Sequence, residues 1–326
     1  MGLVDGTREL MRHDLEVWPA EPGAAPPAGP GAVWSPEAGI TRRGFLVGAG
    51  FAAAVVAAGG IAWRVAPWRD WLGAAGDSLG VDLPGASSKT VQDFVLHSRF
   101  VGKPVDYSIA WPPGAQPGDP LPVCFALPGR NGGPPMGFAD YVATAVREKE
   151  SPQYAVVGTY GGETYWHPRK SGEDYLSFLL HELIPTCARR FKLGGGGRKR
   201  AVIGWSMGAY GALVAAETEP DLFAAVVAVS PAVWTSYDAM MLGPRDAFDD
   251  AADFAKYDVI AHADRLATVN LRIDCGKQDP FYWYVTSLTA ALPKPAAGGF
   301  SKGGHDHEYA SKVAPAEARF IGRALR

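Results

Sequence analysis

The sequence predicts an α/β fold with a mostly parallel central sheet and helices on both of its faces. From about residue 91 onward, short runs rich in apolar and β-branched residues alternate with longer stretches of helical periodicity. Two of these runs, residues 123–127 and 224–230, are almost wholly apolar, as expected for strands that are covered on both faces. Such alternation of strand and helix favours parallel strands joined by crossover helices.

The expected elements follow in order along the chain. Residues 91–97 and 105–111 succeed one another with no helix between them, so they should pair as an antiparallel edge of the sheet. Further strands are expected at residues 123–127, 154–159, 200–204, 224–230 and 269–274. Helices are expected at residues 138–149, 174–190, 207–217, 282–291 and 314–325. A sheet of this kind binds ligands at the carboxyl ends of its strands, so motifs found there are the ones that indicate function.

Composition excludes several functional classes. The 326 residues include 31 Lys and Arg against 34 Asp and Glu, a formal net charge of −3, which argues against a nucleic-acid partner bound through a basic surface. The three cysteines, Cys124, Cys187 and Cys275, are too far apart for a disulfide scaffold or a C-x-x-C zinc module. Because all three lie in apolar or helical stretches, we expect buried free thiols.

The first 90 residues differ from the rest of the chain. Residues 1–40 hold six Gly and six Pro and carry six acidic against two basic residues, which predicts a disordered leader. The stretch T-R-R-G-F-L at residues 41–46 opens a nearly uncharged run over residues 45–63 and resembles a twin-arginine export signal. That run is long enough for a membrane anchor, and a buried core helix is the alternative. We therefore expect a twin-arginine signal or anchor at residues 41–64, a linker at 65–90 and a globular domain at 91–326.

A G-x-S-x-G motif at residues 204–208 lies where an expected strand runs into an expected helix. A strand-turn-helix joint of this form exposes the serine hydroxyl, here that of Ser206, and aims the free N–H groups of the helix N-terminus at the reacting centre. The motif therefore makes Ser206 a candidate nucleophile. A joint that uses glycine and serine for geometry alone is the alternative interpretation.

A serine nucleophile needs a base to take its proton and an acid to orient that base, and in this type of fold both follow the serine along the chain. The candidate acids are Asp279, in a loop past an expected strand, and Asp274, at the end of that strand; the turn at Gly276 favours Asp279. The candidate bases are His305 and His307, in a glycine-flanked loop before the last helix. The H-x-H spacing would also suit a metal, but no third ligand set is apparent, so we predict no metal site.

Five motifs follow one another along the chain: L-P-G-R-N-G at residues 127–132, G-W-S-M-G at 204–208, S-P-A-V-W at 230–234, I-D-C-G-K-Q-D-P-F at 273–281 and G-G-H-D at 303–306. In this order they resemble the α/β-hydrolase "putative esterase" family, which takes in S-formylglutathione hydrolases (esterase D), secreted feruloyl esterases and mycolyltransferases. Pro128 stands where the family has a histidine in its oxyanion loop. The resemblance covers roughly residues 91–326 and implies the α/β-hydrolase fold for this catalytic domain.

The resemblance also implies roles for individual residues. It makes Asp279 the catalytic acid. The secreted members of the family would make His305 the base, whereas the formylglutathione branch would select His307. By the same carry-over, the backbone N–H groups of Arg130 and Met207 would hold the oxyanion.

Three aromatic side chains are candidates for substrate contact. Trp166 and His167 follow the expected strand at residues 154–159, so they should lie at the same end of the sheet as Ser206. Trp205 is the neighbour of Ser206 in the chain. For Trp166 and His167, an ordered loop whose aromatic side chains simply pack is the alternative.

The sequence therefore predicts an exported serine hydrolase of carboxylesterase type, which cleaves an ester or thioester through an acyl-enzyme on Ser206. This chemistry needs no metal and no organic cofactor. The expected partners are a small-molecule or cell-envelope ester and the twin-arginine export machinery, with residues 45–63 as an optional membrane anchor. The alternatives are an envelope acyltransferase of mycolyltransferase type and a catalytically inactive envelope-binding module.

Overall fold

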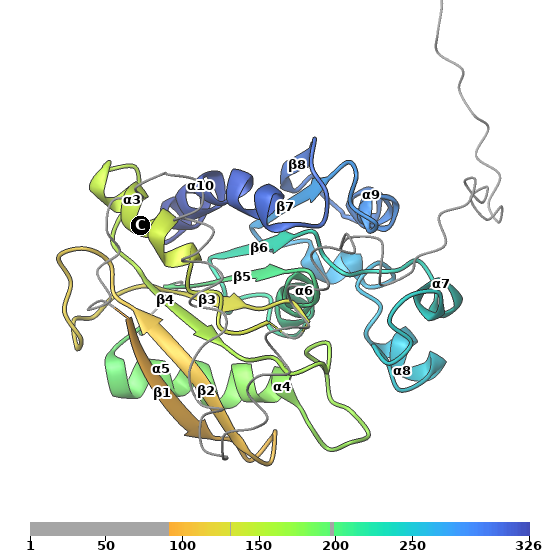
Figure 1. Cartoon of the computed structure of the whole chain (residues 1–326), viewed down its shortest axis with the longest axis horizontal. Coiled ribbons are helices and arrows are strands. Elements are labelled where there is room, and N and C mark those ends of the chain that lie inside the picture. The colour runs from red at the N-terminus through yellow and green to blue at the C-terminus, as the bar shows by residue number, and fades with distance from the viewer. Residues whose placement is uncertain (1–90, 131, 196–198) are drawn as a thin grey trace, which may run out of the picture. The chain divides into compact units, whose positions relative to one another are not determined.

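The computed structural model describes residues 91–130, 132–195 and 199–326. The leader, the twin-arginine signal or anchor and the linker predicted for residues 1–90 lie outside the described residues. The described part is built on an eight-stranded sheet in the order β1-β2-β4-β3-β5-β6-β7-β8, with helices on both faces (Figure 1). Its strands are β1 (Val91–His97), β2 (Pro104–Ala110), β3 (Val123–Leu127), β4 (Ala155–Thr159), β5 (Arg200–Trp205), β6 (Ala225–Val229), β7 (Leu271–Gly276) and β8 (Ala297–Ser301).

The directions of the strands confirm the predicted class. β1 pairs antiparallel with β2 and β2 antiparallel with β4, whereas the remaining pairings, from β4 across to β8, are parallel. β3, β4 and β6 are buried at every residue, because helices cover the sheet on both sides. Their continuous apolar runs are therefore the sequence signal of doubly covered strands.

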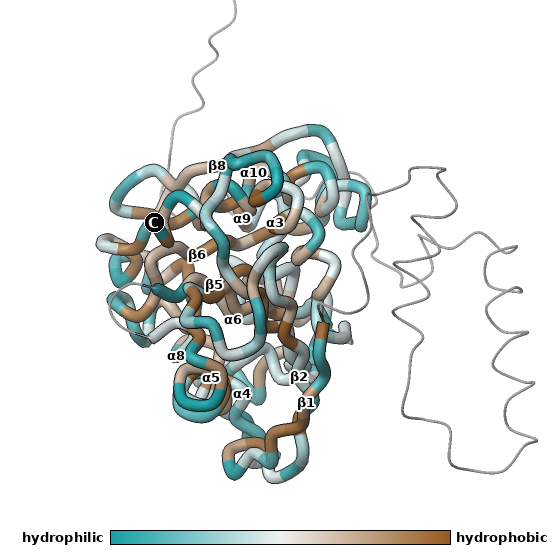
Figure 2. Tube along the Cα trace, turned by 90° about the vertical axis from the view of Figure 1, so that its left-hand side faces the viewer, coloured by the Kyte–Doolittle hydropathy of each residue, from teal (hydrophilic) through white to brown (hydrophobic). Residues whose placement is uncertain are grey.

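Two apolar cores fill the space between the sheet and its helices. Alternate residues of a strand face opposite sides, so Phe125 packs into one core and Cys124 into the other. The core that contains Cys124 lies under α3 (Phe138–Arg147) and α10 (His307–Ala324), which also pack against each other. The larger core lies under α4 (Tyr175–Ser177), the π-helical η1 (Phe178–Leu183), α5 (Ile184–Phe191), α6 (Met207–Thr218) and α9 (Tyr282–Ala291). Figure 2 shows the hydrophobic stretches gathered in the interior around β5, β6 and α6.

Several elements were not expected from the sequence. β8 is an exposed strand at the edge of the sheet, and its sequence A-G-G-F-S lacks apolar alternation, with Gly298 and Gly299 at φ 88° and 142°. The helices α7 (Tyr237–Met241), α8 (Ala251–Lys256) and η2 (Ala263–Leu266) are too short to show a helical period. Helix α10 begins at His307 rather than at residue 314, because the Asp306 carboxylate caps it by accepting from Tyr309 N at 2.8 Å.

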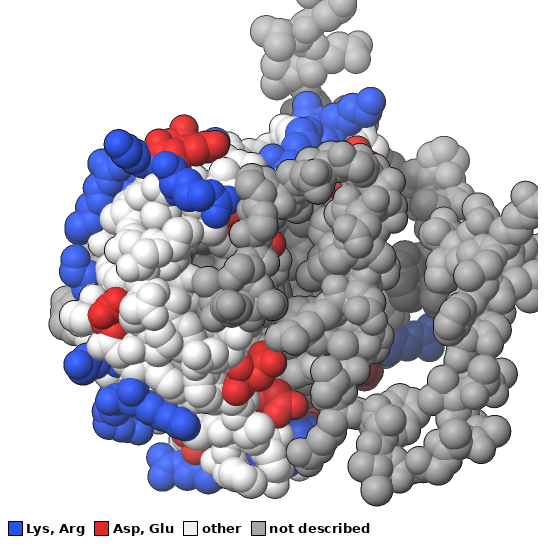
Figure 3. All heavy atoms as spheres, turned by 60° about the vertical axis from the view of Figure 1, so that its left-hand side comes forward, with Lys and Arg blue, Asp and Glu red and all other residues white. Residues whose placement is uncertain are grey.

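The described surface carries both signs of charge. On the face in Figure 3, Lys and Arg side chains lie mainly around the margin, and smaller groups of Asp and Glu lie between them. None of the helices in the described ranges is both long and apolar enough to cross a membrane.

Candidate active site

Ser206 sits on a sharp turn between β5 and α6. Its backbone has φ 53° and ψ −115°, a region that non-glycine residues seldom occupy and that costs on the order of 1–3 kcal/mol. Neighbouring chain holds it there, because Ser206 N–H donates to Val229 O at 3.0 Å and Ser206 O accepts from Ala232 N at 3.1 Å. The side chain of Ser206 is thereby presented at the carboxyl end of the sheet.

The two glycines of the G-x-S-x-G motif are explained by how closely this turn packs. A Cβ atom on Gly204 would lie 2.0 Å from Gly208 O, and one on Gly208 would lie 2.1 Å from Leu127 O. Both contacts are with backbone atoms, which cannot move aside as a side-chain tip can. The motif therefore brings β5, α6 and the end of β3 into direct contact beside Ser206.

Three of the predicted residues come together at this turn. His305 Nε2 lies 3.0 Å from Ser206 Oγ, and His305 Nδ1 lies 2.9 Å from Asp279 Oδ2. The Asp279 side chain is fully buried, whereas His305 keeps 23% of its side-chain surface exposed. When the Nδ1 proton faces the carboxylate, Nε2 is free to accept from the Ser206 hydroxyl. The arrangement can therefore activate a serine.

Hydrogen bonds between two loops set the position of Asp279 against His305. Phe281 N–H donates to Asp279 Oδ1 at 2.8 Å, so the carboxylate oxygen that does not face the histidine is also satisfied. Gln278 joins the two loops twice, because its N–H donates to Gly303 O at 2.9 Å and its Oε1 accepts from Gly303 N at 2.8 Å. Gln278 was not among the predicted site residues, and its only sequence signal is its place one residue before Asp279.

Asp274 and His307, the alternative acid and base, lie in other networks. Asp274 accepts from Arg272 Nε at 2.6 Å and from Nη2 at 3.1 Å, and burial raises the pKa of Asp274 against the opposing effect of that arginine. His307 lies in the first turn of α10, where its Nδ1 is 3.2 Å from Ser311 Oγ. Neither residue belongs to the hydrogen-bonded set that contains Ser206.

The two predicted oxyanion donors, Arg130 and Met207, belong to segments that adjoin Ser206. Arg130 is the second residue of a tight turn after β3, closed by Gly132 N–H donating to Gly129 O at 3.0 Å. A Cβ atom on Gly129 would lie 3.5 Å from Ser206 Cβ, so this turn lies directly against the serine. Met207 is the first residue of α6, where the helix dipole adds partial positive charge. Neither the Arg130 nor the Met207 N–H donates to an acceptor among the described residues.

Two aromatic side chains flank His305. The ring centroids of Trp205 and Phe281 lie 4.8 and 5.3 Å from that of His305. Both rings are only partly buried, so each keeps surface that a bound molecule can contact. Trp205, a predicted substrate contact, therefore lies beside His305, and so does Phe281, which was not among the predicted contacts.

Trp166 and His167 do not occupy such a position, although both were predicted as substrate contacts. Both are fully buried. Trp166 packs against Gly161 and Gly211. His167 is stacked between Phe248 and Tyr257, with ring centroids at 5.0 and 4.8 Å, and burial lowers the pKa of His167. The loop that carries these two side chains thus turns them into the core, where they pack as the alternative interpretation had it.

The three cysteines are free and buried, as predicted. Burial raises the pKa of Cys187 and of Cys275 to about 12, so neither is a reactive thiolate near neutral pH. In the part of the chain that the structure describes, no three His, Cys, Asp or Glu side chains are grouped so as to hold a metal ion.

Comparison with known proteins identifies the family. The sequence profile of the family described as "Putative esterase" matches residues 98–311. Among solved structures, a ferulic acid esterase superposes with a TM-score of 0.63 at 20% identity, covering 72% of this chain and 98% of that one. An S-formylglutathione hydrolase from Agrobacterium tumefaciens superposes with a TM-score of 0.59 at 18% identity, covering 72% of this chain and 95% of that one. A fluorophosphonate-binding serine hydrolase F from Staphylococcus aureus gives 0.55 at 20% identity, covering 72% and 98%. No curated protein sequence matches the chain significantly.

At these identities the solved structures establish the fold, which is that of the α/β-hydrolases. The family profile spans more than half of the chain and includes Ser206, Asp279 and His305. The chain therefore belongs to the "Putative esterase" family and is an ester-hydrolysing enzyme.

Proposed function

We propose that the enzyme acts through an acyl-enzyme on Ser206, with His305 as the base and Asp279 as the acid. The continuous line of hydrogen bonds from Asp279 through His305 to Ser206 carries this proposal. The strained backbone of Ser206 supports it, since strain of this kind persists only where the surrounding structure holds it and is concentrated at functional sites.

The geometry gives each residue one task. The Ser206 oxygen bonds to the ester carbonyl carbon while its proton passes to His305 Nε2, and the N–H groups of Arg130 and Met207 hold the charge that develops on the carbonyl oxygen. The bond to the alcohol or thiol then breaks, and the leaving group takes the proton from His305. Water repeats the sequence on the acyl-enzyme, releasing the acid and restoring Ser206. Asp279 keeps the imidazole in the working tautomer and stabilises its protonated form.

A small-molecule or cell-envelope ester or thioester is the proposed substrate. Two structural relatives are named for substrates of these two kinds: a ferulic acid esterase for an ester, and an S-formylglutathione hydrolase for a thioester. The partly buried rings of Trp205 and Phe281 would contact the groups next to the scissile bond. This surface suits an aromatic or apolar group better than a charged one.

Export is proposed on the sequence alone. The stretch T-R-R-G-F-L at residues 41–46 and the apolar run at 45–63 support export through the twin-arginine machinery, with or without a retained anchor. Mass spectrometry of the mature N-terminus distinguishes a cleaved signal from an anchor. Product analysis with competing alcohol acceptors distinguishes hydrolysis from acyl transfer to an envelope alcohol, because both reactions share the acyl-enzyme.

Hydrolysis of a p-nitrophenyl ester series by the full chain tests the catalytic assignment. Ser206→Ala and His305→Ala should each lower kcat by at least about 10⁴-fold, because the triad acts as a unit. His307→Ala is the matched control and should stay within about twofold of the unaltered enzyme. Full activity in Ser206→Ala would refute the nucleophile, and equal losses in the two histidine variants would refute the choice of base.

A further inference from the structure

Two carboxylates hold the side chain of Arg130, the residue whose N–H is proposed to bind the oxyanion. Nη1 and Nη2 of Arg130 donate to the two oxygens of Asp246 at 2.9 and 2.5 Å, in a two-pronged pair. Nε and Nη2 also donate to Glu163 Oε2, at 3.3 and 2.8 Å. Arg130, Glu163 and Asp246 together form the Arg130 clamp.

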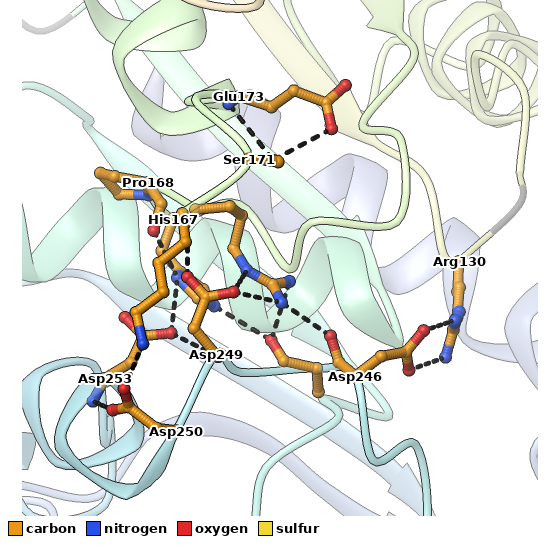
Figure 4. A network of polar contacts seen from close by, with 12 residues as sticks. Arg130, His167, Pro168, Ser171, Glu173, Asp246, Asp249, Asp250 and Asp253 are labelled. Carbon is orange, nitrogen blue, oxygen red and sulfur yellow. Dashed lines mark hydrogen bonds and ion pairs between the residues drawn. The ribbon is translucent and has the colours of Figure 1, made fainter.

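The clamp ties the oxyanion loop to two segments that are distant in sequence. Glu163 belongs to the loop between β4 and α4, and Asp246 belongs to the segment between α7 and α8. Asp246 is held from a second side, because its carbonyl oxygen accepts from Arg169 Nη2 at 2.9 Å. Arg169 is mostly buried and donates through Nε to Asp249 at 3.0 Å. Figure 4 shows Arg130 joined to Asp246 and the polar contacts that continue from the Asp246 segment toward Asp249.

The loop around Arg130 has little in its own sequence to fix it. The stretch L-P-G-R-N-G-G at residues 127–133 surrounds Arg130 with three glycines, which leave the backbone more freedom than any other residue. An oxyanion donor contributes in full only when it is held within about 0.5 Å of its working position. A two-pronged arginine–carboxylate pair fixes geometry as well as charge. The clamp therefore restrains the very residue whose backbone N–H must be held in place.

We propose that Glu163 and Asp246 are positioning residues of the oxyanion hole, which act on its backbone donor through the guanidinium of Arg130. The inference rests on the proposed function, since it needs Arg130 N–H to face the developing oxyanion. The carboxylates make no bond to the substrate. Their combined charge exceeds that of the guanidinium, so the Arg130 side chain supplies a restraint and not a free cation.

Another exposed ion pair joins the same two segments without touching Arg130. Lys170 Nζ donates to Asp250 Oδ2 at 2.5 Å, which links the loop before α4 to the start of α8. Lys170→Met removes this link and leaves the Arg130 clamp intact. It is therefore a matched control for the general effect of tethering the two segments.

Kinetics of the full chain test the clamp with Glu163→Gln, Asp246→Asn and the double variant. The probes are a p-nitrophenyl ester and a trifluoromethyl ketone, which becomes tetrahedral on the serine and places its oxygen in the oxyanion site. The double variant should lose about tenfold in kcat with KM within about twofold, because a displaced donor costs less than a missing one. The Ki of the ketone should rise by the same factor, while the Ki of the product acid stays constant.

The control and the unfolding temperature complete the test. Lys170→Met should match the unaltered enzyme in kcat and in Ki, and all variants should unfold at nearly the same temperature, since exposed ion pairs add little stability. The side chain of Glu163 is 50% exposed, so Glu163→Gln should fold even if the double variant does not. This single variant should still lose about threefold in kcat, with a matching rise in the Ki of the ketone.

Three results would overturn the inference. In the first, kcat and the ketone Ki of the double variant are unchanged. In the second, KM and the product Ki rise together with the ketone Ki, as a merely structural role would give. In the third, Lys170→Met reproduces the loss. Failure of the proposed function looks different, because the unaltered enzyme would then hydrolyse no ester and bind no ketone.

Discussion

The buried carboxylate of Asp279 lies 2.9 Å from His305 Nδ1 and takes a second hydrogen bond, at 2.8 Å, from Phe281 N–H. Both oxygens of this carboxylate are thus engaged. An acid held in this way fixes the imidazole in the tautomer that can accept from Ser206. The proposed catalytic acid, and not only the proposed nucleophile, can therefore be tested by a single substitution.

Asp279→Asn should lower kcat by about 10⁴-fold with little change in KM, because an amide next to Nδ1 favours the wrong imidazole tautomer. Asp306→Asn is the control, because Asp306 is the neighbour of His305 and asparagine caps a helix as well as aspartate does. Steady-state kinetics on one ester compares the two variants. An Asp279→Asn enzyme that retains more than about a tenth of its kcat would show that another group orients the base.

Gly208→Ala should destabilise the fold and abolish activity together. The added Cβ would lie 2.1 Å from the backbone oxygen of Leu127, and such overpacking costs about 1–3 kcal/mol or more. Gly243→Ala is the control, since its nearest contact would be at 3.6 Å, and it should change the free energy of unfolding by less than about 0.5 kcal/mol. Urea unfolding measures both, and equal stability of the two variants would contradict the packing of the turn.

Glu217 should make stability depend on pH. Burial raises the pKa of Glu217 to about 8 from 4.5, an effect that Arg265 opposes and that Asp258 and Asp264 strengthen. Because the pKa of Glu217 is higher in the folded than in the unfolded state, its contribution to the free energy of unfolding is fully present below about pH 4.5. That contribution is lost as the pH rises through about 8.

Glu217→Gln should therefore be more stable than the unaltered protein at alkaline pH, by on the order of a few kcal/mol, and should lose this advantage in acid. Glu219→Gln, an exposed change near the end of the same helix, is the control. Urea unfolding at roughly pH 5 and roughly pH 9 measures the difference. Parallel pH profiles for Glu217→Gln and the unaltered protein would contradict the burial effect.

Alanine substitutions of Trp166 and Trp205 should distinguish a ring that packs in the core from a ring that contacts the substrate. Trp166→Ala removes a fully buried ring and should cost about 3–5 kcal/mol in the free energy of unfolding, with KM unchanged across an ester series. Trp205→Ala removes a partly buried ring beside His305 and should shift KM several-fold at a smaller cost in stability. If Trp166→Ala changed KM selectively with acyl length, its assignment to the core would be wrong.

Several strands of the sheet could be predicted from the sequence because buried strands consist almost entirely of apolar residues. β3 and β6 are apolar at every position, and covered strands leave that pattern in any sequence. β8 could not be found in this way, because an exposed edge strand that contains Gly298 and Gly299 needs neither alternation nor apolar residues. Its place is set by parallel pairing with β7, which is a tertiary contact.

The three residues of the hydrogen-bonded line could be predicted because each lies in a short local motif and their order along the chain is characteristic of the fold. The orientation of loop side chains could not. His167 faces inward because its ring is stacked between Phe248 and Tyr257, and its Nε2 lies 3.1 Å from the carbonyl of Ala247, 80 residues away. The carboxylate partners of Arg130 could not be predicted either, because Asp246 lies 116 residues away along the chain.

Covalent labelling examines the proposed nucleophile without any assumption about the natural substrate. The full chain is treated with a fluorophosphonate probe, digested and analysed by peptide mass spectrometry, alongside Ser206→Ala and His305→Ala. A single adduct on Ser206 is expected, absent from Ser206→Ala and formed far more slowly in His305→Ala. An adduct on any other residue, or labelling of Ser206→Ala at the rate of the unaltered enzyme, would contradict the assignment.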